Sequence, residues 1–244
     1  MDLLLDKGSQ DEYKKEYGQT LITTYAKIDG WSVGVIANQR KVVKSKSGEM
    51  QFGGVIYGDA ADKATRFIAN CNQRKIPLVF LQDVTGFMVG TKAEHGGIIK
   101  DGAKMVNAVA NSVVPKFTIV VGNSFGAGNY AMCGKAYDPR LILAWPTAKM
   151  AVMGGSQAAN VLLQLEKSAA KKSGVKVDEK EEIAIKEKID KHYKNKTDIM
   201  YAASQLWIDA VIDPAETRSW ISMGIDMANH APITEKFNMG ILQV

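Results

Sequence analysis

Residues 120–131, VVGNSFGAGNYA, place a glycine-rich turn directly after an apolar run that begins at Phe117. Residues 122–126 read G-x-S-x-G, the nucleophile turn of serine hydrolases, and residues 126–131 read G-x-G-x-x-A, the phosphate turn of dinucleotide-binding folds. Both patterns need a strand before the turn and a helix after it. The stretch therefore predicts a strand–turn–helix unit and leaves open which chemistry the turn performs.

Strand and helix patterns alternate on both sides of this unit. Apolar runs at 21–28 and 31–37, joined by Asp29-Gly30, predict a β-hairpin, and a continuous apolar run at 77–82 predicts a buried strand. The other expected elements are a polar helix at 11–17, a helix capped by Asp59, a helix over 98–109, short strands at 141–145 and 150–153, a helix from about Gln157, and a last helix started by Asp213 and Pro214. This alternation predicts one α/β domain with parallel strands over residues 1–244.

Composition and charge exclude several classes of protein. The chain has 244 residues and a net charge of +5, with lysines and acidic residues interleaved, so we expect no nucleic-acid partner. Cys71 and Cys133 lie in apolar helical patterns without metal-like spacing, so we expect buried free thiols, a reducing compartment and no metal site. No apolar stretch suits a signal peptide or a membrane span, which predicts a soluble intracellular protein. Residues 166–198, rich in Lys and Glu, predict a solvated, charged helical insertion.

The two patterns in the turn predict different site residues. A dinucleotide site needs an acidic residue about 20 positions after the turn, but the strand expected at 141–145 runs into Pro146 and Lys149 instead. A serine hydrolase would use Ser124 as the nucleophile and His230 as the base, with Asp209 or Asp213 to orient the imidazole. That interpretation depends on His230 alone, because the other two histidines lie in a glycine-rich loop and in the charged insertion.

A third interpretation needs no catalytic side chain. Small residues at a strand-to-helix turn let a ligand oxygen approach the unpaired N–H groups of the first helical turn, which form an oxyanion hole. A second set of donors would come from the glycine loop at 82–90, which follows the neighbouring strand. Two such loops at the ends of adjacent strands are expected to point their amides into one crevice.

Four longer motifs extend beyond the turn: LQDVTGFMVG (81–90), GGIIKDGAKMVNAVA (96–110), GNSFGAGNYAMCGKAYDPR (122–140) and WPTAKMAVMGGSQAANVL (145–162). In this order they resemble the carboxyltransferase (beta) subunit of biotin-dependent acyl-CoA carboxylases, and the similarity runs from about Tyr17 to the C-terminus. The GFMVG and GAGNYAMCG forms are most similar to the methylcrotonoyl-CoA type. The alpha subunit of related decarboxylases, such as the glutaconyl-CoA type, remains an alternative. The resemblance implies a crotonase-like (ClpP/crotonase) spiral of repeated ββα units.

Subunits of this family carry two crotonase-like domains in tandem, and this chain resembles only the second, C-terminal one. The resemblance implies transfer of a carboxyl group from carboxybiotin to an acyl-CoA such as 3-methylcrotonoyl-CoA or propionyl-CoA. It assigns the biotin-side oxyanion hole to the backbone at Ala127, Gly128, Gly86 and Phe87. At Gly128 we expect a ligand oxygen to meet the backbone, so that a branched side chain there would block transfer while the fold is retained. The alternative is that Gly128 only lets the helix pack against its strand, in which case valine would overpack and lower stability.

The resemblance also implies contacts and partners. The residues expected to contact biotin are Phe87, Met88, Val89, Asn129 and Gln157, and a purely structural role stays open for Phe87, Met88, Asn129 and Gln157. Biotin would be carried by a biotin carboxylase or biotin carboxyl carrier subunit, and the coenzyme A thioester would bind mainly to the N-terminal carboxyltransferase domain. We further expect a homo-oligomer without membrane contact, in the cytoplasm or, in a eukaryote, the mitochondrial matrix.

Overall fold

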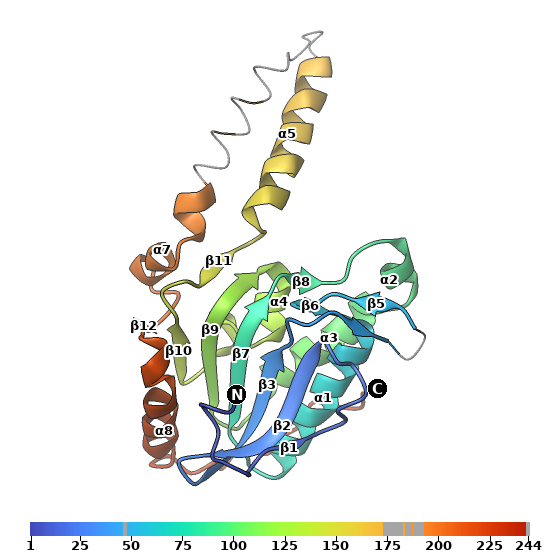
Figure 1. Ribbon diagram of the computed structural model, residues 1–244. Helices are drawn as coiled ribbons and strands as arrows, with labels where there is room; N and C mark the ends of the chain where they lie inside the picture. Colours follow the sequence, from blue (N-terminus) through green and yellow to red (C-terminus); the bar gives the residue numbers. More distant parts are fainter. Residues whose placement is uncertain (46–47, 173–182, 184–186, 188–192, 243–244) are drawn as a thin grey trace.

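The computed structural model describes residues 1–45, 48–172, 183, 187 and 193–242, which form a mixed sheet with helices on both faces (Figure 1). The sheet has eight strands in the order β1-β2-β3-β7-β9-β10-β12, and β11 pairs with β9 beyond the end of β10. These strands are β1 (Asp11–Glu12), β2 (Leu21–Ile28), β3 (Trp31–Asn38), β7 (Leu78–Val84), β9 (Lys116–Phe125), β10 (Leu141–Ala144), β11 (Lys149–Ala151) and β12 (Ala210–Val211). Two small pairs, β4 (Val43–Lys44) with β5 (Met50–Gln51) and β6 (Val55–Ile56) with β8 (Gly86–Phe87), lie outside it.

Parallel pairing brings the ends of the central strands to one edge. The β2–β3 hairpin is antiparallel, with its turn at Asp29 (φ 55°) and Gly30 (φ 82°) as predicted. From β3 onward the ladder is parallel, and Ile119 in β9 lies opposite both Leu81 in β7 and Leu143 in β10. The segments that follow β7, β9 and β10 therefore all start at the same edge.

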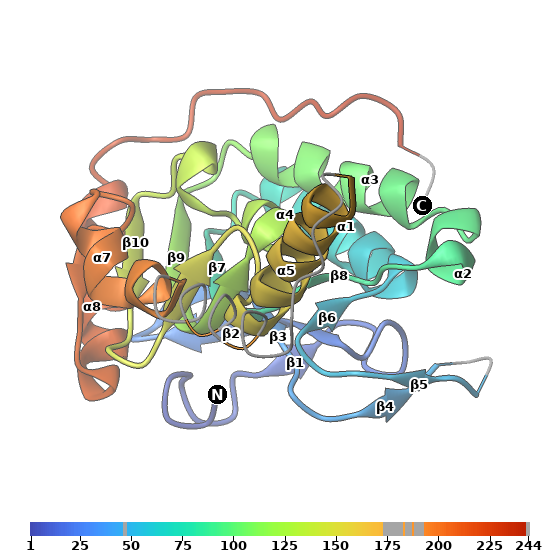
Figure 2. The same cartoon turned by 90° about the horizontal axis from the view of Figure 1, so that it is seen from above.

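Helices cover the two faces of the sheet unequally (Figure 2). The first face carries α1 (Gly58–Gln73), α3 (Ile98–Ala110) and α4 (Gly126–Ala131), which bury a core that includes Phe67, Phe80 and Met105. The second face carries α8 (Thr217–Ala228), which packs Ile221 and Ile225 on it. The other helices are α2 (Thr91–His95), η1 (Lys135–Tyr137), α5 (Gly155–Lys172), α7 (Ile199–Ser204) and η2 (Pro214–Glu216). The α5 helix projects away from the sheet (Figure 1), and among the described residues no helix combines the length and apolar character needed to cross a membrane.

Most predicted elements are present, and the differences have local causes. The polar helix expected at 11–17 is wrong: Lys14 has a positive φ of 49°, and the Tyr13 N–H donates to the Thr23 carbonyl of β2. Asp59 does not cap α1, which begins one residue earlier. Asp213 does act as an N-cap and accepts from the Ala215 N–H at 2.8 Å, but it starts the 3₁₀ turn η2 before α8. Of the insertion expected at 166–198, residues 173–182, 184–186 and 188–192 lie outside the described residues.

Lys63 is an unusual member of the interior. Its side chain lies on the buried side of α1 and is 1% exposed. Among the described residues its Nζ has no hydrogen-bond partner. Burial disfavours the ammonium form and lowers the pKa of Lys63 from 10.5 to about 8, although Glu12 and Asp59 act in the opposite direction. Protonated Lys63 therefore opposes folding.

Replacing Lys63 with Met should raise the free energy of unfolding near pH 7 by about 3 kcal/mol, because the pKa falls from 10.5 to about 8 and one pKa unit corresponds to about 1.4 kcal/mol. The folded chain releases this proton near pH 8 and the unfolded chain near pH 10.5, so the wild type gains stability between these values. The advantage of the variant should shrink across that window, as measured by urea unfolding. Arg66→Met on the exposed side of α1 is the control, and an equal effect there would contradict the assignment.

Candidate active site

The glycine-rich turn joins the end of β9 to α4. Phe125 is still extended, and Gly126 then takes a positive φ of 53°. A Cβ at Gly126 would also lie 2.9 Å from the carbonyl oxygen of Val152. Only glycine therefore suits this position. The first N–H groups of α4 have no acceptor within the helix, and Ala127 in this turn is exposed.

The second glycine turn follows β7 and touches the first. Gly86 has a φ of 145°, and a Cβ added at this position would have no atom within 4 Å. A Cβ at Gly128 would lie 3.2 Å from the Gly86 Cα and 2.5 Å from a methyl carbon of Val84. The two loops therefore converge as the sequence predicts, in direct contact at the edge of the sheet.

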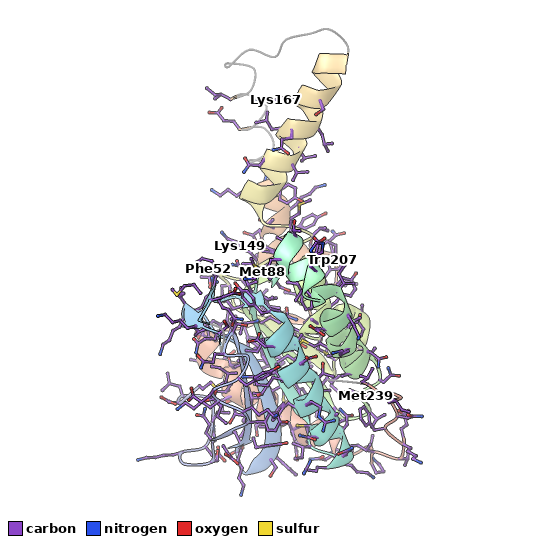
Figure 3. The ribbon with its side chains drawn as sticks, turned by 90° about the vertical axis from the view of Figure 1, so that its right-hand side faces the viewer. Phe52, Met88, Lys149, Lys167, Trp207 and Met239 are labelled. Carbon is purple, nitrogen blue, oxygen red and sulfur yellow. The ribbon has the colours of Figure 1, made fainter. Side chains whose placement is uncertain are left out.

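A cavity of about 800 Å³ opens on the other side of α4. Ala127 and Asn129 of α4 line it together with residues of β11, with Val152 and with aromatic side chains. Two of these, Tyr201 and Trp207, pack edge to face with their ring centroids 5.9 Å apart. In Figure 3, Trp207, Lys149 and Met88 lie at the same end of the molecule, near the base of α5. The arrangement offers backbone donors beside a mostly apolar hollow.

Ser124 is fully buried, and its hydroxyl is engaged on both sides. Its Oγ donates to Gln82 Oε1 at 2.6 Å and accepts from Asn129 Nδ2 at 2.7 Å. The expected base is far away, because α8 begins beside Trp145 and runs back along the sheet, so that Gly224 packs on Phe117 at the start of β9. His230 lies beyond that end, which is about 20 Å from Ser124 at roughly 3.3 Å per strand residue.

The expected orienting acids are also occupied elsewhere. Asp209 accepts from Lys135 Nζ and from the Ile142 N–H, at 2.9 and 2.8 Å, and Asp213 caps η2. Burial raises the pKa of the Cys133 thiol, which follows α4, to about 11, so it is a poor nucleophile near pH 7. The hydrolase interpretation of Ser124 and His230 is wrong: the fold separates the two residues.

The carboxyl transferase domain model matches residues 2–239. The chain belongs to this family. It is 46% identical over 232 residues to the mitochondrial methylcrotonoyl-CoA carboxylase beta chain of Arabidopsis thaliana, which covers 95% of this chain and 37% of that protein.

Solved structures give the same assignment. The beta subunit of P. aeruginosa geranyl-CoA carboxylase superposes with a TM-score of 0.81 at 36% identity, over 96% of this chain and 42% of that one. The hexameric transcarboxylase 12S core with methylmalonyl-CoA and methylmalonic acid bound gives a TM-score of 0.80 at 36% identity, over 96% and 42%. The crotonase-like α/β fold is thereby confirmed, and the chain spans about two fifths of the length of these family members.

The family assignment leaves open where each expected site residue lies. Ala127 and Asn129 line the cavity, but the Asn129 side-chain amide is committed to Ser124. The expectation for Gly128 needs correction, because its missing side chain faces Val84 and not open space. This glycine lets the two turns pack together.

The residues expected on the second turn lie on the far side of α4 from the cavity. The Phe87 ring packs against Gly102 of α3, where a Cβ would lie 3.0 Å from it, so Phe87 belongs mainly to the core. The Met88 N–H donates to the Ile56 carbonyl at 2.9 Å and is unavailable to a ligand. Val89 is 75% exposed. Gln157 does not belong to the second turn but lies early in α5, and its side chain is outside the described part of the structure.

Sequence reasoning missed Gln82, Tyr201 and Trp207. Gln82 had a visible signal, since it is a polar residue at the end of an apolar strand and is fully buried in the fold. Tyr201 and Trp207 follow the charged insertion, and no local pattern connects them with the turn 70 or more residues earlier. Only the fold brings them to α4.

Gly128→Ala should lower the free energy of unfolding by about 1–3 kcal/mol, because its Cβ would lie 2.5 Å from Val84. Adding Val84→Ala should return part of this loss by making room for the new methyl group. Urea unfolding of the two single variants and the double variant measures the coupling. A Gly128→Ala protein as stable as the wild type would show that the turns do not pack as described.

Proposed function

We propose that this chain is the carboxybiotin-side half of the carboxyltransferase of a biotin-dependent acyl-CoA carboxylase. The observation that carries this proposal is the contact between two glycine turns beside a cavity, with Ala127 exposed at the junction. Among the described residues, no pair of acidic or histidine side chains lines that cavity to act as a general acid and base. The site is suited to binding an oxyanion with backbone donors.

The residues present fit a carboxylated ureido ring held by a partner. Carboxybiotin supplies the carboxyl group and a ureido oxygen on which negative charge grows as the N–CO₂ bond breaks. The amides at Ala127 and Gly128 would stabilise that charge, with one such donor contributing about 3 kcal/mol. Phe87 would support the second glycine turn by packing on α3. Asn129 would hold the turn in place through its hydrogen bond to the buried Ser124.

The proposal extends to substrate and partners. The identity with the methylcrotonoyl-CoA carboxylase beta chain supports a branched or unsaturated acyl-CoA as the acceptor. Because the chain spans about two fifths of its relatives, we place the thioester mainly on an N-terminal carboxyltransferase domain, and biotin on a carrier subunit. Similarity to a hexameric transcarboxylase core supports a homo-oligomer. The mitochondrial relative supports a matrix location if the source is a eukaryote.

The isolated chain should transfer little or no carboxyl group, because the thioester half is missing. Addition of the N-terminal carboxyltransferase domain should restore transfer from carboxybiotin to 3-methylcrotonoyl-CoA, measured as incorporation of labelled carboxyl into the thioester. Robust transfer by the chain alone would refute this division of labour. Efficient removal of the carboxyl group of glutaconyl-CoA by the reconstituted enzyme would favour the decarboxylase alternative.

Ala127→Pro tests the backbone donor directly. Proline removes the N–H at the second position of α4, where the helix does not use it, and is tolerated in a first turn. We expect transfer by the reconstituted enzyme to fall about 100-fold or more, with little change in melting temperature. Ala127→Ser keeps the amide and is the matched control. If the proline variant retains full transfer, this amide is not part of the oxyanion hole.

A further inference from the structure

A chain of buried hydrogen bonds ties α4 to the two strands beneath it. Asn129 Nδ2 donates to Ser124 Oγ at 2.7 Å, and Ser124 Oγ donates to Gln82 Oε1 at 2.6 Å. Gln82 Nε2 then donates to the Met132 carbonyl at 2.7 Å. Gln82 lies on β7 and Ser124 on β9, while Asn129 and Met132 lie in α4 and at its C-cap. The chain therefore begins and ends on the helical segment and passes through both strands.

The direction of every bond in this chain is fixed by chemistry. The Met132 carbonyl can only accept, so Gln82 turns its amide NH₂ toward it and presents Oε1 to Ser124. Ser124 must then donate its single proton to Gln82 and accept from Asn129. Reversing one member would leave a buried polar atom unpaired, which is costly. One arrangement is thus favoured over its alternatives.

The helix needs this support because it is short. Six residues are too few to hold helical geometry alone. Gly128 sets how closely α4 approaches Val84 and Gly86, but a glycine contact places little restraint on rotation about the helix axis. Two side-chain contacts supply that restraint: Asn129, in the middle of α4, binds Ser124, and Gln82 binds the C-cap carbonyl of Met132.

We propose that Gln82 and Ser124 are positioning residues for carboxyl transfer, which hold α4 so that its first-turn amides face the cavity lined by Ala127. The catalytic consequence rests on the proposed function. The Ser124 proton is engaged by Gln82, so Ser124 acts through Asn129 and α4 and does not act on the substrate.

Three variants separate positioning from general stability. Ser124→Ala removes the middle of the chain, and Gln82→Met removes both bonds of the glutamine with little change in volume. Thr118→Val is the matched control: its buried hydroxyl donates to the Cys133 carbonyl at 2.6 Å, so it also joins β9 to the segment after α4 but lies outside the chain. For each variant we would measure amide hydrogen exchange in the full chain, and kcat and KM after reconstitution with the N-terminal domain.

In Ser124→Ala and Gln82→Met we expect exchange to accelerate tenfold or more at the Met132 and Gly134 amides, which donate to Gly128 and Asn129. The kcat should fall about 10–100-fold at an unchanged KM for the acyl-CoA, and the double variant should be no worse than the more severe single one. Thr118→Val should melt at a lower temperature yet keep wild-type kcat.

Wild-type exchange and kcat in Ser124→Ala would overturn the positioning role, as would an equal loss of kcat in Thr118→Val. A wild-type enzyme without any transfer would instead reject the proposed function. In that case the exchange pattern alone decides whether Gln82 and Ser124 hold α4, since it needs no activity.

Discussion

The parallel pairing of β7 with β9 is the constraint on which the site depends. It places Leu81 opposite Ile119 and carries both strands to the same edge, where each ends in a glycine turn. An antiparallel neighbour would have sent the second turn to the opposite end of the sheet. The contact of Gly128 with Val84 and Gly86, the cavity beside α4 and the buried chain through Gln82 and Ser124 all follow from that register.

Under the proposed function, this constraint also explains why the site would need few reactive side chains. Backbone donors at strand ends are fixed by the sheet and change neither charge nor protonation with pH, so the fold itself supplies the electrostatics. Titratable groups near the turn are engaged in structure instead: Asp209 holds Lys135 and the start of β10, and Cys133 is buried. In the proposed function, the reactive carboxyl group comes from the bound carboxybiotin.

Patterns of short range predicted most of the fold. The Asp29-Gly30 turn and the buried strand runs depend on neighbouring residues alone, and the alternation of elements follows from them. The helix predicted at residues 11–17 is absent. Their polar sequence resembles that of an exposed helix, but the hydrogen bond from Tyr13 to Thr23 ties the segment to β2 instead. The sequence was enough to predict two converging glycine loops, but it did not show which neighbours each residue of the loops contacts. Whether Gly128 opens to a ligand or to Val84, and whether Ser124 meets His230 or Gln82, depends on contacts between segments far apart in sequence.

The position of Gly126 has a spatial consequence. Its backbone abuts the Val152 carbonyl, and β11, which leads to that residue, is paired with the last residues of β9, Asn123 to Phe125. Three residues after Val152 the chain reaches Gly155 and enters the projecting helix α5. The glycine turn and the base of α5 are thus neighbours in space, so a molecule that binds against the base of α5 would also lie close to the turn.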